Sequence, residues 1–243
     1  MPVVFVHGVP ETAELWDGVR ASIDRESVAL SLPGFGNAAP DGFARTKEAY
    51  ASWLREALDA IAGPIDLVGH DWGAILSTRV ITTAPDRIRS WVVDSVANFD
   101  TAYVWHDLAR LWQTPGDGEA FYDAFNAMTA EERIAGLVAV GIPEAFAPAM
   151  AVPDPEMQRS ILALYRSATD VFGDWGDALA PTPMPGLVLL ATNDGFGDLS
   201  LATAVADSLG ARTERLDGLG HWWMLEDPPR VANTLERFWS SAD

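Results

Sequence analysis

The chain contains no cysteine and a single lysine, Lys47. Without cysteine it has no disulfide, no thiolate nucleophile and no thiolate zinc ligand. With Lys47 as the only lysine, a Walker phosphate loop and a Schiff-base lysine placed after a strand both lack their residue. We therefore expect neither a cofactor nor a bound metal.

Positive charge is scarce as well. The 16 lysine and arginine residues face 35 aspartate and glutamate residues, which gives a net charge of -19. The arginines are scattered and form no basic patch, so nucleic acid and anionic membranes are not expected as partners. The first residues, "MPVVFVHG", include no basic region and no long apolar run, so we expect no signal peptide, no transmembrane helix and a cytoplasmic location.

Short apolar runs alternate with helical patterns along most of the 243 residues. Each run ends in a loop containing glycine or aspartate, and together they predict six strands, at residues 3–8, 27–34, 65–69, 90–96, 187–192 and 212–217. Most of these runs are continuously apolar, which is typical of a parallel sheet that helices cover on both faces. The sequence therefore predicts an α/β fold of one domain with an insertion.

The alternation stops between residues 98 and 182, where helical patterns follow one another without a strand. We interpret this stretch as a helical insertion, and residues 1–97 and 183–243 as the α/β core. Aromatic side chains are numerous enough in the insertion to cover a pocket, although packing inside a helical layer would explain most of them. They include Trp105, Trp112, Tyr122, Phe125, Tyr165, Phe172 and Trp175.

The segment "GHDWG", residues 69–73, directly follows the predicted strand 65–69. A Gly-x-x-x-Gly bracket at this point forms a sharp turn that lifts its central residue, usually a serine, above the carboxyl edge of the sheet. Here the central residue is Asp71, and the apolar helical stretch behind it has an N-terminal dipole that favours an ionised carboxylate. Asp71 is therefore the candidate nucleophile. The alternative is an aspartate that only caps this helix.

A candidate base stands after the last predicted strand. Of the four histidines, only His221 lies there, on a loop with two glycines that would bring the imidazole above the same edge as Asp71. An acid that orients the imidazole should follow the preceding strand, where Asp194 stands at the strand end and Asp198 lies further along the loop. We favour Asp194, because a group fixed at a strand end holds the imidazole better. Asp198 is the alternative.

The segment "HGVP", residues 7–10, follows the first predicted strand. We expect the backbone N–H groups of Val9 and Trp72 to form an oxyanion hole, with Pro10 fixing the chain after Val9. A plain turn is the alternative.

Together these segments resemble the α/β-hydrolase superfamily, in particular its aspartate-nucleophile branch of epoxide hydrolases and haloalkane dehalogenases, and most closely the epoxide hydrolases. The motifs that match are "HGVPE", "LPGFG", "GHDWG", "ATND" and "GLGHW", spread over nearly the whole chain. The resemblance implies a mostly parallel sheet of about six strands, without the two antiparallel strands that the family has ahead of the first one. It also implies that residues 98–182 form a helical cap over the active site. An altered sheet edge would suit a second subunit, which gives the hypothesis of a homodimer.

In this branch the carboxylate attacks a saturated carbon, which leaves an alkyl-enzyme ester on Asp71. His221, oriented by Asp194, would then activate a water molecule that hydrolyses the ester. The N–H groups of Val9 and Trp72 would stabilise the oxyanion, each donor contributing ~3 kcal/mol. The implied substrate is a small apolar epoxide, opened to a vicinal diol.

The resemblance places the choice of electrophile in the cap. An opening epoxide needs a hydrogen-bond donor at its oxygen, and "ALYRSA" around Tyr165 looks like the second cap tyrosine of epoxide hydrolases. The position of the first cap tyrosine falls on Leu111, so our candidate for that role is His106. Tyr103 or Tyr122 could replace it, and a purely structural His106 is equally compatible with the sequence.

A haloalkane dehalogenase with the same triad is the first alternative function. Trp72 matches the halide-binding tryptophan of dehalogenases, but epoxide hydrolases share it, and Val9 lacks the side-chain donor that many dehalogenases have there. A cap tryptophan could supply that donor, and the candidates are Trp105, Trp112 and Trp175. Fluoroacetate-type dehalogenation is disfavoured because it uses arginine at the position of Trp72. The minor alternative is a non-catalytic ligand-binding protein of this fold, which the complete set of reactive residues disfavours.

Overall fold

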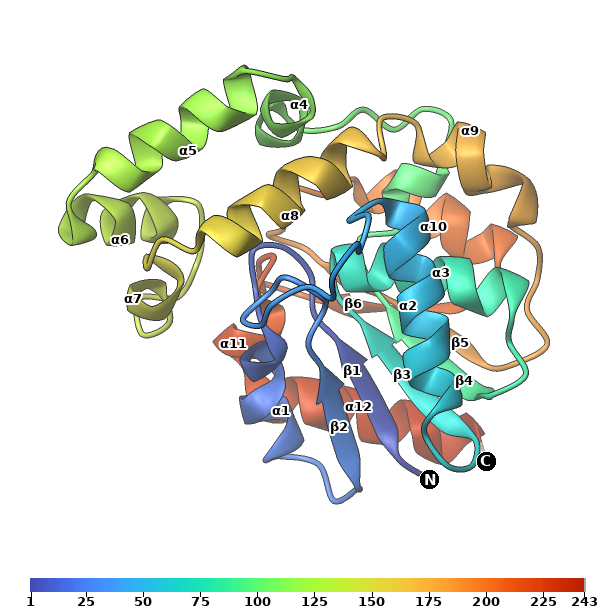
Figure 1. Ribbon diagram of the computed structural model, residues 1–243. Coiled ribbons are helices and arrows are strands. Elements are labelled where there is room, and N and C mark those ends of the chain that lie inside the picture. Colours follow the sequence, from blue (N-terminus) through green and yellow to red (C-terminus); the bar gives the residue numbers. More distant parts are fainter. Residues whose placement is uncertain (243) are drawn as a thin grey trace.

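The computed structural model describes residues 1–242 and contains one six-stranded sheet (Figure 1). The strand order is β2-β1-β3-β4-β5-β6, and every neighbouring pair is parallel. The strands are β1 (Val3–Val6), β2 (Ser27–Leu30), β3 (Ile65–Gly69), β4 (Ile88–Val93), β5 (Gly186–Ala191) and β6 (Arg212–Leu216). The six predicted strands and their parallel arrangement are confirmed.

Strand pairing at β1 and β2 ends earlier than the apolar runs suggested. The run 3–8 is paired only to Val6, and the run 27–34 only to Leu30. Beyond these points the chain turns into loops, where the N–H of Leu32 donates to Nε2 of His7 (3.0 Å) instead of to a neighbouring strand. The residues that follow the strands are therefore free to build loops at the carboxyl edge of the sheet.

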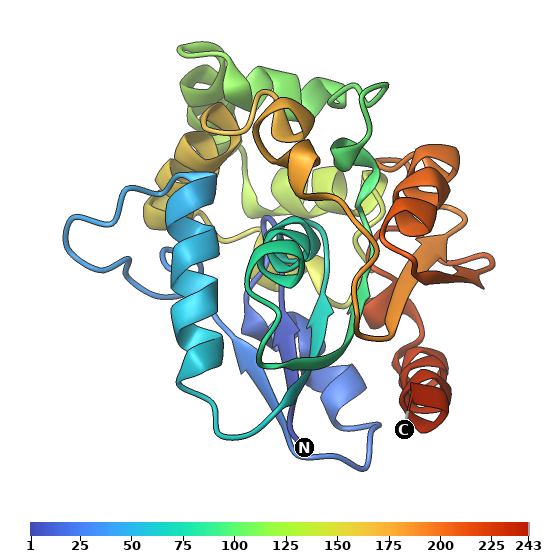
Figure 2. The same ribbon diagram turned by 90° about the vertical axis from the view of Figure 1, so that its right-hand side faces the viewer.

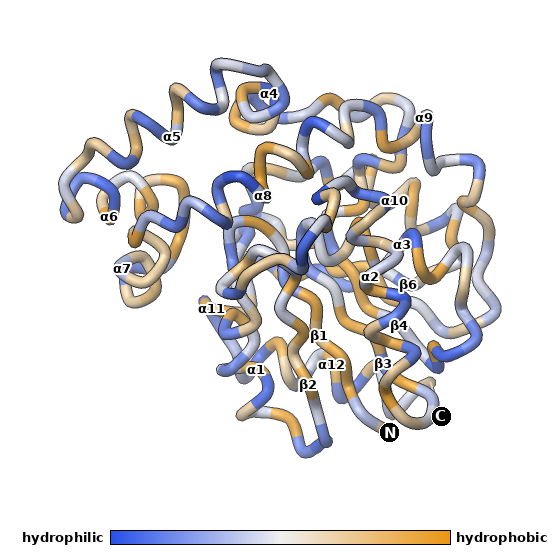
Figure 3. The backbone as a smooth tube through the Cα atoms, in the orientation of Figure 1, coloured by the Kyte–Doolittle hydropathy of each residue, from blue (hydrophilic) through white to orange (hydrophobic). Residues whose placement is uncertain are grey.

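Helices cover both faces of the sheet (Figures 1 and 2). One face packs against α2 (Lys47–Asp59), α3 (Trp72–Thr83) and α10 (Leu199–Ser208), and the other against η1 (Ala13–Trp16), α1 (Asp17–Arg20), α11 (Trp223–Glu226) and α12 (Pro228–Ala242). Alternate residues of β1 serve the two faces, since Val4 and Val6 belong to the first core and Val3 and Phe5 to the second. Burial on both faces explains why every residue of β1 is apolar, as the colouring of Figure 3 shows.

Six helices stand between β4 and β5, and we call them the inserted helices. They are α4 (Asp107–Gln113), α5 (Asp117–Ala127), α6 (Ala130–Ala139), α7 (Ala147–Met150), α8 (Pro155–Arg166) and α9 (Val171–Trp175), flanked by η2 (Ala97–Phe99) and η3 (Gly176–Ala178). Polar caps begin several of them; for example, Thr129 accepts from the Glu132 N–H at α6 and Asp154 caps α8. Figure 1 shows these helices above the carboxyl ends of the strands, where the motif residues lie.

The core segment 183–243 inferred from the sequence ends at Asp243, which lies outside the described residues. Within residues 1–242, no helix is both long enough and apolar enough to cross a membrane.

Lys47 ties the core to the inserted helices. Its side chain is almost fully buried at the start of α2, and its Nζ donates to the carboxylate of Asp174 (2.7 Å) and to the carbonyl oxygen of Ser167 (2.8 Å). The ammonium also lies 5.4 Å from the ring centroid of Trp175. Burial lowers the pKa of Lys47, but the hydrogen bonds to Asp174 and Glu48 outweigh burial and raise it. The only lysine of the chain is therefore placed as a charged link.

We expect Lys47→Met to lower the free energy of unfolding by about 1 to 3 kcal/mol, because it leaves a buried carbonyl oxygen without its donor and removes a charge-assisted bond. Urea unfolding followed by circular dichroism measures this difference. Arg55→Met, an exposed change on the same helix, is the control and should stay within about 0.5 kcal/mol of the parent. Equal losses in the two variants would show that the Lys47 link carries no stability.

Candidate active site

Asp71 occupies the turn between β3 and α3 in a strained conformation. Its backbone has φ 49° and ψ -119°, a region that costs a non-glycine residue ~1 to 3 kcal/mol. The side chain forms no capping hydrogen bond with α3, so the alternative of an aspartate that only caps the helix is wrong. A Cβ on Gly73 would collide with the carbonyl oxygen of Val6, which explains why the turn requires glycine there. The strain places the carboxylate above the sheet edge.

The loop after β1 holds this carboxylate. The backbone N–H of Val9 donates to Oδ1 of Asp71 at 2.9 Å. A Cβ on Gly8 would collide with the Asp71 side chain, so glycine permits the close approach of the loop. Of the two N–H groups expected from the sequence, that of Val9 hydrogen-bonds the Asp71 carboxylate, and that of Trp72 stands at the start of α3 directly after it.

His221 and Asp194 form a pair at the carboxyl ends of the last two strands. Nδ1 of His221 lies 2.9 Å from Oδ2 of Asp194, and the other carboxylate oxygen accepts the N–H of Phe196 at 2.8 Å. Asp198 is committed elsewhere, because its exposed carboxylate accepts from two N–H groups in the first turn of α10. Of the two acids considered from the sequence, the structure brings Asp194 to His221.

The charges around Asp71 decide its protonation. Loss of hydration, together with the negative charge of Glu11, raises the pKa of Asp71 to about 6, although the charges of His221 and His70 oppose this shift. Burial lowers the pKa of His221, but the charge and hydrogen bond of Asp194 outweigh burial and raise it. At neutral pH the Asp71 carboxylate is therefore mostly ionised, and the pKa of the His221 imidazole is raised.

Asp94, the residue after β4, holds the turn that carries Asp71. Its Oδ1 accepts the backbone N–H of Asp71 (2.9 Å), and its Oδ2 lies 2.6 Å from Nδ1 of His70 and accepts the indole N–H of Trp223 (2.7 Å). The sequence reasoning did not select Asp94. An acidic residue directly after an apolar strand, in "WVVDSV", was the signal that could have identified it.

Glu11 makes the corresponding contacts on the side of the β1 loop. Its carboxylate accepts from the Gly8 N–H and from the Trp222 indole, each at 2.8 Å, and lies 3.7 Å from Nε2 of His70. Burial disfavours both charges, yet the pairing lowers the pKa of Glu11 to about 2 and raises that of His70 well above its usual value. The loop that carries Val9 is therefore fixed to the loop that carries His221.

Glu11, His70 and His221 are close enough to one another to suggest a metal site. Their ligand atoms all lie within 4.8 Å of each other, the one such group among residues 1–242. However, Nδ1 of each histidine is engaged by an aspartate, and both oxygens of Glu11 accept from Gly8 and Trp222. This donor set fits a hydrogen-bond network better than a metal cage.

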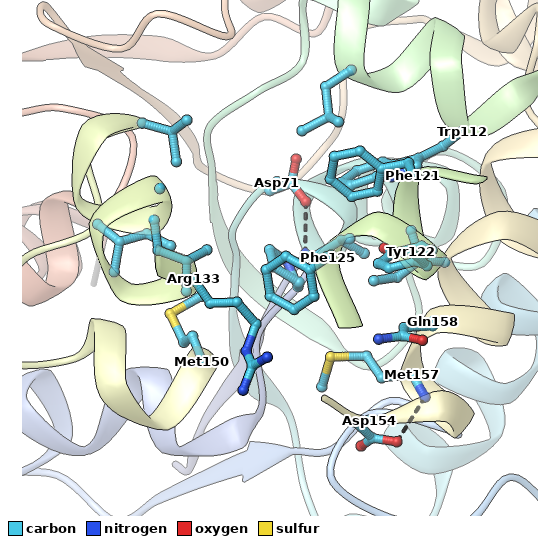
Figure 4. A pocket seen from close by; sticks show the side chains of 18 of the residues that line it. Asp71, Trp112, Phe121, Tyr122, Phe125, Arg133, Met150, Asp154, Met157 and Gln158 are labelled. Atoms are coloured by element: carbon cyan, nitrogen blue, oxygen red, sulfur yellow. Dashed lines mark hydrogen bonds between the residues drawn. The ribbon is translucent and has the colours of Figure 1, made fainter. Parts of the chain in front are cut away.

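A cavity of about 460 Å³ opens above Asp71 (Figure 4). Most of its wall is aromatic or aliphatic, and the main contributors are Trp112, Phe121, Tyr122, Phe125, Met157, Ile161 and Tyr165. Polar side chains line the remainder, namely His106, Glu132, Arg133, Asp154, Gln158 and His221. Its size and apolar lining are typical of a small-molecule site.

Tyr165 is the buried hydroxyl-bearing residue of this wall. Its ring centroid lies 5.3 Å from that of Trp72 and 5.0 Å from that of Trp112. Burial and the nearby negative charge of Asp71 raise the pKa of Tyr165 well above its usual value, so the hydroxyl keeps its proton. The indole Nε1 atoms of Trp72 and Trp112 are buried without a hydrogen-bond partner among the described residues. Three buried aromatic groups near Asp71 thus carry N–H or O–H protons.

His106 both caps α4 and lines the cavity. Its Nδ1 accepts the N–H of Ala109 at 3.2 Å, and burial with the charge of His221 lowers its pKa to about 4. A neutral imidazole that accepts through Nδ1 carries its proton on Nε2, so this atom is a donor.

The other aromatic residues considered from the sequence differ in whether they line the cavity. Tyr122 lines the cavity and stacks on Trp112, with ring centroids 6.1 Å apart. Tyr103 packs on Trp105 outside the cavity lining, and Trp175 lies against Lys47. Trp112 is therefore the tryptophan of the three dehalogenase candidates that faces the cavity.

Comparison with known proteins assigns the chain to a family. The sequence model of the alpha/beta hydrolase family matches residues 3–234. The chain therefore belongs to the alpha/beta hydrolase family, and the fold implied by the sequence motifs is confirmed.

Curated relatives lie in both reaction classes. The chain is 26% identical to a haloalkane dehalogenase of Bradyrhizobium diazoefficiens over 185 residues, which cover 68% of this chain and 59% of that protein. It is 34% identical to epoxide hydrolase 2 of Siraitia grosvenorii over 103 residues, 39% of this chain and 32% of that protein. The matches thus span less than two thirds of either relative. Among solved structures, the haloalkane dehalogenase DatA from Agrobacterium tumefaciens C58 has a TM-score of 0.80 at 19% identity, covering 100% of this chain and 90% of that one, which shows the shared fold.

The raised pKa of Asp71 predicts that its ionised form lowers stability. Above pH 6 Asp71 is ionised in the folded protein, where its charge is less well solvated than in the unfolded chain. Below pH 4 the Asp71 carboxyl group is protonated in both the folded and the unfolded state, so its ionisation no longer lowers stability. Asp71→Asn should therefore raise the free energy of unfolding at pH 8 by up to about 3 kcal/mol, with a smaller gain at pH 4.5. Urea unfolding at the two pH values measures the gain. Asp123→Asn, an exposed change on α5, is the control, and a pH-independent gain at Asp71 would contradict the assignment.

Proposed function

We propose that this protein is a hydrolase that attacks a saturated carbon with Asp71, and that its substrate is a small apolar epoxide. One observation carries the proposal: the Asp71 carboxylate, held by the Val9 N–H, faces an apolar cavity that His221 also lines. A carboxylate attacking an ester would gain little, but one attacking an alkyl carbon forms a stable ester intermediate. The family membership and the mixed set of relatives agree with this class of reaction.

In the first step a carboxylate oxygen of Asp71 bonds to one ring carbon and the carbon–oxygen bond of the epoxide breaks. The developing alkoxide takes a proton from a donor in the cavity wall, and Tyr165 and the Nε2–H of His106 fit this role. In the second step His221 removes a proton from water, and the hydroxide adds to the carbonyl carbon of the ester. The resulting oxyanion lies at the N–H groups of Val9 and Trp72. When it collapses, the alkyl oxygen takes the proton from His221 and leaves as the vicinal diol. The proton of the added hydroxyl group returns to the cavity-wall donor, which restores the Asp71 carboxylate.

A haloalkane substrate is the second candidate, and a specific observation favours it. The indole N–H groups of Trp72 and Trp112 are buried and have no hydrogen-bond partner among the described residues, and both indole rings pack against the Tyr165 ring. Weak N–H donors in a dry site suit a departing halide, which needs no proton. The first step would then break a carbon–halogen bond, and the second step would be unchanged.

Substrate panels with matched variants separate the two candidates. With aryl and alkyl epoxides we expect diol formation, and Tyr165→Phe should lower kcat by about 100-fold or more because the ring oxygen loses its donor. Trp112→Phe should lower epoxide turnover by less than about tenfold. Bromide release from bromoalkanes without diol formation, with Trp112→Phe as the more damaging change, would reverse the assignment.

The two steps should differ in their pH dependence. Alkylation needs ionised Asp71, so its rate should fall as the pH drops through about 6. Ester hydrolysis needs neutral His221, whose raised pKa moves this requirement to higher pH. Rapid-quench single turnovers should therefore show the alkyl-enzyme ester accumulating above about pH 6 and accumulating less as the pH rises through the raised pKa of His221. Identical pH profiles for both steps would contradict these roles.

A further inference from the structure

Two cavities meet at His221. Besides the cavity above Asp71, a second cavity of about 470 Å³ lies between the end of α6 and the loops that follow β5 and β6. Three residues line both cavities: Val140, Phe196 and His221. His221 therefore forms part of the wall of both cavities.

The partition between the cavities is thin at Phe196. Its ring centroid lies 5.0 Å from that of His221, 5.1 Å from that of His106 and 5.9 Å from that of Trp222. Phe196 also belongs to the turn of Asp194, whose carboxylate accepts its N–H. One side chain layer thus separates the substrate side from the second cavity at the position of the base.

The walls of the two cavities differ in chemistry. Aromatic and aliphatic side chains dominate the first, whereas four glycines, Asn193 and Glu226 make up much of the second. Water in a protein interior needs about two to four polar partners, which exposed backbone and such side chains supply and an apolar wall does not. While the ester exists, its alkyl group is attached to Asp71 and fills the apolar side.

We propose that the hydrolytic water reaches His221 through this second cavity, which we call the water cavity, while the organic substrate uses the first. This inference rests on the proposed function, since it concerns the second step of that reaction. The water arrives on the face of His221 away from the alkyl group and transfers one proton to the imidazole. Its hydroxide bonds to the carbonyl carbon of the ester, and the alkyl oxygen leaves with the proton from His221.

Narrowing the water cavity from either wall tests the route. Gly195→Leu adds a side chain on the β5 loop, where a Cβ meets nothing within 4 Å, and Ala139→Trp fills the space from α6. Gly136→Leu is the matched control, because it lines only the first cavity and its Cβ is equally unobstructed. Styrene oxide is the probe, and rapid quench with mass spectrometry follows the ester on Asp71. Circular dichroism verifies that each variant folds.

We expect Gly195→Leu and Ala139→Trp to slow ester hydrolysis by about fivefold or more, with alkylation changed by less than about twofold, so that the ester accumulates. Gly136→Leu should show the opposite pattern, with slower alkylation or a higher KM and normal hydrolysis. Native hydrolysis rates in both water-cavity variants would overturn the route.

His221→Gln separates failure of the route from failure of the proposed function. Under the proposed function this variant traps a styrene oxide adduct on Asp71. If the adduct forms and the two water-cavity variants hydrolyse normally, only the route is wrong. If no adduct forms, the proposed function and the route fall together.

Discussion

The placement of a carboxylate on a strained turn is the constraint on which the site depends. Asp71 has a positive φ and is held through its backbone N–H by Asp94 and through its side chain by the Val9 N–H. Each of these hydrogen bonds is worth about 1 kcal/mol in net terms, so several are needed to offset the strain and the lost hydration. The pKa of Asp71 is still raised, which shows that its partners do not fully compensate for the hydration that the carboxylate loses on burial.

A network of acids, imidazole and indoles supplies the needed rigidity. Asp94 and Glu11 each accept an indole N–H from the loop that carries His221, through Trp223 and Trp222 respectively. His70 stands between these two carboxylates, and its raised pKa means that a positive charge balances them in the interior. Three loops from different strands are thereby fixed relative to one another, which is the preorganisation that a two-step reaction on one carboxylate requires.

The inserted helices make one side of the site more apolar than the other. Aromatic side chains of α4, α5 and α8 make the side above Asp71 apolar, whereas the loops after β5 and β6 leave glycines and polar groups on the other side of Phe196. Such a division suits a reaction whose first reactant is an apolar molecule and whose second is water. Tyr165 and Trp112, in contact with each other, offer donors of different strength, and this contact is where epoxide and halide chemistry diverge.

The sequence alone determined the features that depend on local pattern. Apolar or β-branched runs located the six strands, including the mostly polar β6. Because parallel strands end at one edge, the residues after them predicted that Asp71, Val9, His221 and Asp194 would lie near the same edge. Tertiary structure decided the rest. Asp94 and Glu11 matter through partners far away in the chain. Although Asp94 directly follows an apolar strand, no local pattern shows which groups these two acids bind. Tertiary structure also decided which of Trp105, Trp112 and Trp175 faces the cavity, and it formed the second cavity at His221. Both depend on how the inserted helices pack over the sheet, because only long-range contacts fix the direction of their side chains.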